Sequence, residues 1–169
     1  MTNQVSAGQT PRQPGTGRSV RPLDGTDRLI VGELIRDARA SMRSLAERVH
    51  ISRANAYARV DRLVADGVIT GFSAQIAPER AGLGTSAYIS LSIEQNSWRE
   101  VSSRLGRLPY VEHVSMLGAD FDVLVLVRAP DNAALRDLVL DRIQAIPGVQ
   151  TTRTWLVFDE LRGPGPDWS

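Results

Sequence analysis

The sequence predicts an α+β protein in which a helix-turn-helix unit, winged or simple, precedes a βαββαβ unit of the ferredoxin-like type. Three observations support this. Apolar residues in the first part of the chain recur at helical spacing, and the second part alternates strand-like with helix-like segments. The 169 residues suffice for two small units, and 42% hydrophobic with 23% charged residues is an ordinary composition for a folded chain.

Charge is divided unevenly along the chain. The net charge is only +1, yet residues 1–72 carry 11 Arg against 7 acidic residues, and residues 73–169 carry 9 Arg against 12. A basic N-terminal part indicates contact with nucleic acid or with a membrane surface. All basic residues are Arg, which we attribute to compositional bias rather than to function.

The chain lacks the residues that several kinds of functional site require. The chain has no Cys and two His, so disulfides, thiolate sites and His-only metal sites are not expected. The apolar run 123–127 is far too short to span a membrane, and the N-terminus has no apolar leader. We therefore expect a cytoplasmic, nucleoid-associated protein without metal, cofactor or membrane partner.

Composition divides the chain into five segments. We expect a flexible basic tail over residues 1–22, a helix-turn-helix unit over 23–72, a linker strand over 73–84, the βαββαβ unit over 85–160 and a C-terminal tail over 161–169. The first tail either lies on DNA or is inert, and the inert alternative is favoured. Trp168 is expected to lie in a loose C-terminal tail and not to anchor it.

Local signals define three helices in the first unit. Asp24 and Asp27 form the pattern of a capping box ahead of the first helix. Ser41 can cap a short second helix and Ser52 a third, with a tight turn between them, and Gly67 ends the third in the left-handed conformation.

The third helix has the pattern of a recognition helix. With Ala56, Val60 and Leu63 inward, the residues expected to face outward are Arg53, Asn55, Tyr57, Arg59 and Arg62. Arg pairs with guanine or phosphate, and Asn pairs with adenine through both amide atoms. Tyr57 either contacts DNA or covers a helix face. The predicted DNA-binding residues are Arg43, Ser44, Ser52, Arg53, Asn55, Tyr57, Arg59 and Arg62.

The second unit is expected to form a four-stranded antiparallel sheet with both helices on one face. Its strands are predicted near residues 86–93, 111–117, 122–128 and 151–158, and its helices begin near Trp98 and Asp131. The third strand is apolar at every position from 123 to 127, so we expect it to be buried on both faces. Helices cover only one face of the sheet, and the sheet of a second copy of the chain is the simplest candidate to cover the other face. This predicts a homodimer.

The chain from residue 23 to about 160 resembles the Lrp/AsnC (feast/famine) family of transcription regulators. The residues that carry the resemblance are Leu23-Asp24 with Asp27 and Ile30; Leu45-Ala46, Ile51-Ser52, Arg59, Leu63 and the run 67–72; Gly118 with Phe121-Asp122; and Gly148-Val149 with Thr152 and Thr154. The resemblance implies a sequence-specific regulator of double-stranded DNA with a RAM-type second domain. It further implies dimers that assemble into tetramers or octamers, and an amino-acid effector bound between subunits.

The effector site implied by the resemblance lies near the turn 118–122. Carboxylates there can bind an ammonium group, and backbone N–H groups of a glycine turn can bind a carboxylate. A plain hairpin turn is the alternative. The predicted effector-binding residues are Gly118, Ala119, Asp120, Asp122, Thr152 and Thr154.

Two other functions compete with this one. An architectural DNA-binding protein has the same DNA face but no effector. Siroheme decarboxylases resemble this fold put to catalytic use, but they work with histidines, and this chain has two His beside an intact helix-turn-helix. We therefore expect a regulator and not an enzyme.

Overall fold

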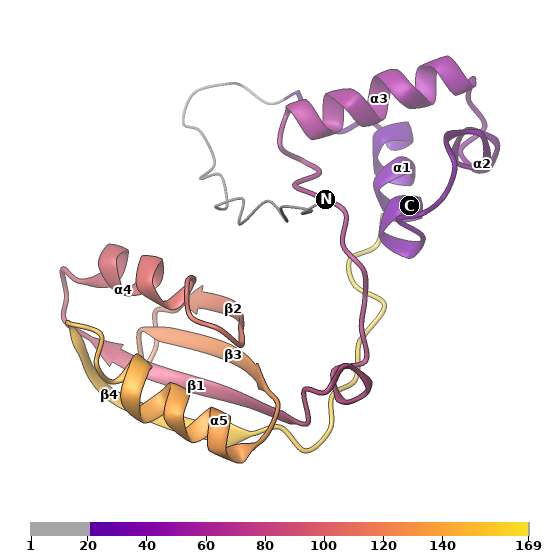
Figure 1. The fold of residues 1–169 in the computed structure, drawn as a ribbon. Helices are drawn as coiled ribbons and strands as arrows, with labels where there is room; N and C mark the ends of the chain where they lie inside the picture. The colour runs from indigo at the N-terminus through magenta and orange to yellow at the C-terminus, as the bar shows by residue number, and fades with distance from the viewer. Residues whose placement is uncertain (1–20, 169) are drawn as a thin grey trace, which may run out of the picture. The chain divides into compact units, whose positions relative to one another are not determined.

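The computed structural model describes residues 21–168, so the tail predicted over 1–22 lies almost wholly outside the described residues. The chain forms two compact units (Figure 1). The first runs to Ala74 and includes the segment from Pro164 onward, and the second spans Gln75–Gly163. Among the described helices, none is long and apolar enough to cross a membrane.

The first unit consists of α1 (Gly25–Arg36), α2 (Met42–Arg48) and α3 (Arg53–Ala65). Each predicted cap forms: Asp24 and Asp27 make the reciprocal capping box, Ser41 accepts from the Ser44 N–H, and Ser52 accepts from the Asn55 N–H. The apolar faces of the three helices meet in one core, whose fully buried members are Ile30, Leu45 and Leu63.

The turn between α2 and α3 is a Schellman motif in which His50, and not a glycine, adopts the left-handed conformation. His50 has φ +54°, and the Ile51 N–H donates to the Ala46 carbonyl at 3.0 Å. Gly67 takes the same left-handed position after α3 with φ +72°, as the sequence predicted. A turn this tight sets α3 at a defined position relative to α2.

The C-terminal segment is not the loose end that the sequence predicted. Trp168 packs against the core of the first unit, at Gly32 in the middle of α1. A Cβ at Gly32 would lie 3.0 Å from the Trp168 Cβ. Glycine in a helix interior costs about 1 kcal/mol relative to alanine, and this close approach explains its presence.

The second unit is a four-stranded antiparallel sheet of order β2-β3-β1-β4. Its strands are β1 (Thr85–Ile93), β2 (Val111–Met116), β3 (Val123–Ala129) and β4 (Val149–Leu156). Its helices are α4 (Trp98–Leu105) and α5 (Asn132–Asp137), which Asp131 caps and which continues as the π-helix η2 (Leu138–Ile143). The predicted βαββαβ order is confirmed.

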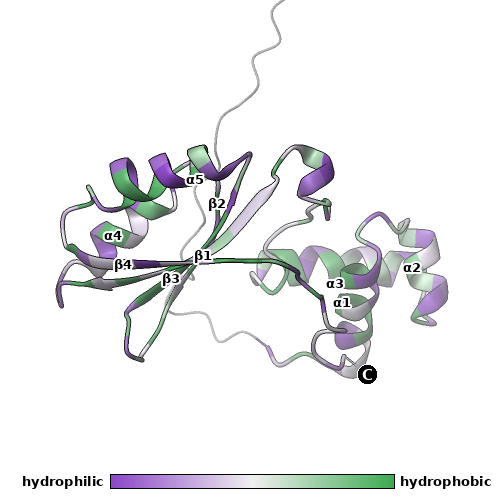
Figure 2. Ribbon diagram, turned by 90° about the horizontal axis from the view of Figure 1, so that it is seen from below, coloured by the Kyte–Doolittle hydropathy of each residue, from purple (hydrophilic) through white to green (hydrophobic). Residues whose placement is uncertain are grey.

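Both helices cover the same face of the sheet (Figure 2). Alternate residues of β1 and β3, among them Ile89, Leu91, Val123 and Val125, are fully buried against these helices. The opposite face, which we call the open face, carries the intervening residues: Tyr88 and Ser90 of β1, Leu124, Leu126 and Arg128 of β3, and Trp155 of β4.

Within the single chain, the open face leaves Leu124 and Leu126 only half-buried, so burial of β3 on both faces still depends on the predicted second copy. Trp155 of β4 is 46% exposed on the same face. Arg128, by contrast, is 7% exposed and is held by Glu112, Glu160 and Ser86. The open face is therefore apolar at its centre and incompletely covered.

The predicted linker strand over 73–84 is not a strand in the single chain. The segment has no regular secondary structure before a short 3-10 helix, η1 (Glu79–Ala81), which ends at Gly82 with φ +81°. A strand needs a partner for its backbone groups, and the described sheet contains no strand from this segment; only at its end does the Gly84 N–H donate to the Pro130 carbonyl, at 3.2 Å.

Candidate nucleic-acid interface and effector pocket

The N-terminal half of α3 presents exposed polar side chains. Arg53, Asn55 and Tyr57 are all exposed, and the Arg53 guanidinium lies 5.6 Å from the centre of the Tyr57 ring. Ala54 and Ala58 lie exposed between them. Residues at the start of a recognition helix are the ones that reach base edges in a major groove, and small side chains allow close approach.

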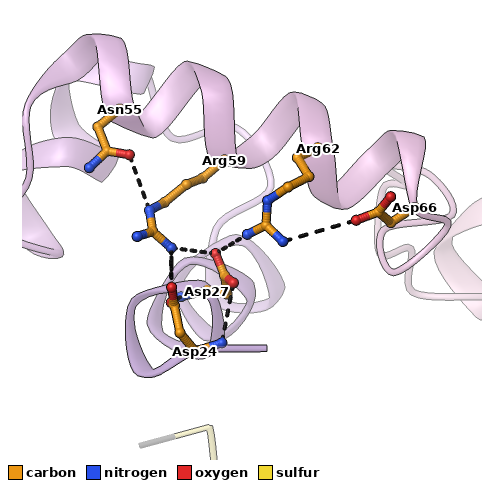
Figure 3. Close-up of polar contacts among 6 residues, drawn as sticks. All are labelled: Asp24, Asp27, Asn55, Arg59, Arg62 and Asp66. Atoms are coloured by element: carbon orange, nitrogen blue, oxygen red, sulfur yellow. Dashed lines mark hydrogen bonds and ion pairs between the residues drawn. The ribbon is translucent and has the colours of Figure 1, made fainter. Parts of the chain in front are cut away.

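Arg59 and Arg62 do not face outward as predicted. They lie against α1, where Asp24 and Asp27 bind them (Figure 3). Arg59 Nη1 is 2.7 Å from an oxygen of each Asp, and Arg62 Nη2 is 2.6 Å from Asp27. We call Asp24, Asp27, Arg59 and Arg62 the α1–α3 ion cluster. Its two negative and two positive charges cancel, so little of its charge remains to attract phosphate.

The α1–α3 ion cluster shifts the pKa values of Asp24, Asp27 and Arg59 toward their charged forms. Burial raises the pKa of Asp27, but hydrogen bonds from Arg62 and Arg59 outweigh it and hold this pKa below its ordinary value of 3.8. The hydrogen bond from Arg59 likewise lowers the pKa of Asp24, and the two carboxylates raise the pKa of Arg59. Asp24, Asp27 and Arg59 are therefore charged at neutral pH.

The remaining predicted DNA contacts lie at helix starts. Arg43 is exposed on α2, where it pairs with Glu47 at 3.0 Å. The Ser44 N–H donates to Ser41 Oγ at 3.1 Å, and Ser52 Oγ accepts from Asn55. Ser52 is thus committed to its cap, while the exposed ion pair of Arg43 is weak enough to open for phosphate.

A pocket of about 410 Å³ opens in the second unit, where the ends of β1 and β2 meet the start of α4. Its volume is in the range of small-molecule sites. The residues that line it are Ile93, Glu94, Gln95, Trp98, Met116, Leu117 and Asp122. Two carboxylates thus face a pocket whose other walls are mostly apolar, an arrangement suited to a ligand with an ammonium group and an apolar part.

The pocket contains one of the six predicted effector residues. Asp122 lines it and also accepts from the Ile93 N–H at 2.8 Å, which ties the turn to β1. The lining does not include Gly118, Ala119 or Asp120. Thr152 and Thr154 pair with β1 from the side opposite β3, and Thr152 accepts from Gln144. In the single chain these residues do not form one site.

Sequence reasoning missed Glu94 and Trp98 as pocket residues. Trp98 is 48% exposed beside the pocket, and the Arg99 guanidinium lies 5.0 Å from its ring centre. A large exposed aromatic residue next to an acidic residue can mark a binding site. Neither Glu94 nor Trp98, however, belongs to the turn 118–122 on which the prediction of the effector site rested. Among the described residues, no group of three or more His, Cys, Asp or Glu could hold a metal ion.

Known proteins share both units. The model of winged helix-turn-helix DNA-binding domains matches residues 23–70, and the model of the Lrp/AsnC ligand binding domain matches residues 86–165. The HTH-type transcriptional regulator AldR of Mycolicibacterium smegmatis is 36% identical over 167 residues, which cover 97% of each chain.

Solved structures agree with this assignment. The leucine response regulatory protein LrpA of Mycobacterium tuberculosis matches with a TM-score of 0.76 and 30% identity, over 87% of this chain and all of that one. A transcriptional regulator of Neisseria meningitidis, solved in complex with L-Met, matches with a TM-score of 0.77 and 27% identity, over 84% of this chain and 94% of that one. Because the two family models match consecutive units that span most of the chain, this protein belongs to the Lrp/AsnC family of transcription regulators.

Proposed function

We propose that this chain is a sequence-specific DNA-binding transcription regulator whose second unit binds an amino-acid effector. The observation that carries the proposal is the exposed start of α3, where Arg53, Asn55 and Tyr57 surround two alanines. The family models of a DNA-binding and a ligand-binding domain support it, as do relatives named as transcriptional regulators. The chain acts by binding DNA and not as an enzyme.

The working form is a homodimer, or a larger assembly of dimers, joined through the open face. Leu124, Leu126 and Tyr88 are half-buried there without a cover, and a two-fold axis would place the same residues of a second copy against them. Such a dimer presents two α3 helices to half-sites separated by whole turns of DNA.

The effector site is the pocket beside α4, where Glu94 and Asp122 bind the ammonium group. Ile93, Trp98 and Met116 contact an apolar side chain of the ligand. A structure of a relative in complex with L-Met supports an amino acid of this kind. Gly118, Ala119, Asp120, Thr152 and Thr154 complete the site only through a second copy, because one chain does not bring them to the pocket.

Arg53→Ala is expected to weaken binding to a selected DNA site about tenfold. Because one cation per protomer leaves the interface, the slope of the logarithm of the binding constant against the logarithm of the salt concentration should become shallower by about one per protomer. Fluorescence anisotropy over a salt series measures both quantities. Arg104→Ala removes the same charge from an exposed position in the second unit and serves as the matched control. Equal behaviour of the two variants would show that α3 does not bind DNA.

Glu94→Gln is expected to weaken the effector response, because it removes one of the two carboxylates that bind the ammonium group. A thermal-shift screen of the twenty amino acids should identify a ligand that stabilises the wild type by about 2.7 kcal/mol at a hundredfold excess over its Kd. The variant should need a higher concentration of that ligand. Glu100→Gln changes an exposed residue of α4 outside the pocket and is the control. The absence of any stabilising amino acid would favour an effector-independent architectural protein.

A further inference from the structure

The side chain of Asn55 is held in one orientation by Arg59. Arg59 Nε lies 3.1 Å from Asn55 Oδ1, one helical turn further along α3 (Figure 3). An arginine Nε–H can only donate a hydrogen bond, so the atom that faces it must be the amide oxygen. The amide nitrogen of Asn55 therefore points away from Arg59, and it has no hydrogen-bond partner among the described residues.

Arg59 is itself fixed by the α1–α3 ion cluster. Its Nη1 donates to Asp24 Oδ1 and Oδ2 at 2.9 and 2.7 Å and to Asp27 Oδ1 at 2.7 Å. The planar guanidinium thus has one edge on α1 and its Nε–H on Asn55. Since Asp27 is fully buried, this anchor is part of the folded core and does not depend on DNA.

This geometry changes what Asn55 can recognise. Bidentate recognition of adenine uses both amide atoms, the oxygen to accept from N6 and the nitrogen to donate to N7. With the oxygen directed at Arg59, the outward group is an NH₂ with two donors. Guanine presents two acceptors, N7 and O6, on its major-groove edge, whereas adenine presents one acceptor beside a donor.

We propose that Arg59 is a positioning residue that turns the donor end of Asn55 toward the major groove, so that Asn55 selects guanine over adenine. This inference rests on the proposed function. It assigns Arg59 a role in specificity, and it revises the adenine contact that the residue type alone suggests.

The experiment is a DNA sequence selection carried out with the full chain. Asn55→Ala first identifies the base position that depends on Asn55. At that position the wild type is expected to prefer guanine over adenine by about tenfold. Arg59→Lys keeps a cation for Asp24 and Asp27 but lacks the fixed Nε–H, so the amide is free to rotate and the preference should shift toward adenine.

Arg62→Lys is the matched control. It makes the same chemical change in the same ion cluster, since Arg62 binds Asp27, but Arg62 makes no contact with Asn55. The control should keep the preference for guanine. A merely structural role of Arg59 would change stability and overall affinity in both variants and leave the selected base unchanged.

Asn55→Asp provides a second test that does not disturb Arg59. The carboxylate still accepts from Arg59 but cannot donate, so the preference for guanine should be lost, with cytosine, whose N4 donates, favoured instead. Selection of adenine by the wild type, or guanine retained by both Arg59→Lys and Asn55→Asp, would overturn the inference while leaving the proposed function intact. Failure of the wild type to select any sequence would overturn both.

Discussion

Replacing Asp27 with Ala is expected to lower the free energy of unfolding of the first unit by about 3 kcal/mol. The Asp27 side chain is fully buried and binds Arg59 at 2.7 Å and Arg62 at 2.6 Å. Removing one member of a buried ion pair costs about 3–5 kcal/mol, because the remaining charge loses its compensation. The low end applies here, since both arginines keep some access to solvent and Asp24 still binds Arg59.

Urea unfolding followed by circular dichroism measures this loss. Asp61→Ala is the control, because Asp61 is an exposed acidic residue of α3 outside the α1–α3 ion cluster. Its change in stability should stay within about 0.5 kcal/mol. Similar losses in the two variants would mean that the cluster contributes no more than an ordinary surface charge.

The same carboxylates make stability depend on pH in a defined direction. The folded pKa values of Asp24 and Asp27 lie below the ordinary value of 3.8, so the unfolded chain binds more protons as the pH falls. The stabilisation is therefore fully present above the ordinary pKa and is lost as the pH falls below it, through the folded values. Asp27→Ala should make the free energy of unfolding depend less steeply on pH below the ordinary pKa. A pH dependence equal to that of the wild type would contradict the role assigned to Asp27.

If the proposed dimer forms through the open face, Leu126→Asp is expected to raise its dissociation constant at least about a hundredfold, or about 2.7 kcal/mol. The physical reason is that a carboxylate at the apolar centre of the open face would be buried in the interface without a partner. A dissociated monomer also binds only one DNA half-site, so it loses the gain in affinity that two linked half-sites provide. We therefore expect binding to a two-half-site DNA to weaken by about two orders of magnitude or more.

Sedimentation of the wild type and the variant tests this prediction. Leu140→Asp is the matched control, because Leu140 lies on η2, whose helix packs on the covered face of the sheet, and is itself 53% exposed. That variant should remain dimeric and bind DNA normally. A dimer that survives Leu126→Asp but dissociates with Leu140→Asp would place the interface on the helical side instead.

The helix boundaries of the first unit could be predicted because their signals are local. Asp24 with Asp27, Ser41 with Ser44, and Ser52 with Asn55 each act over three residues, so the linear sequence contains both partners. The inward positions Ala56, Val60 and Leu63 follow from helical periodicity in the same way, and the structure buries all three. The order of elements in the second unit was predictable for the same reason.

By itself, the sequence determined the family, the order of elements, the caps and the face of α3 that enters the core. The tertiary structure decided what depends on residues far apart in the chain. Arg59 and Arg62 have the same periodicity as DNA-binding arginines, and only the packing of α1 on α3 brings Asp24 and Asp27, 32 to 35 residues earlier, into contact with them.

The pocket beside α4 and the C-terminal segment likewise depend on residues far apart in the chain. Asp122 was visible in the turn motif, but Glu94 and Trp98 join it only because β1 pairs with β3 and α4 begins beside that edge. Trp168 meets Gly32 from the opposite end of the chain. Periodicity reports which face a residue occupies, because that depends on its neighbours in sequence. The partner it meets depends on packing between distant segments.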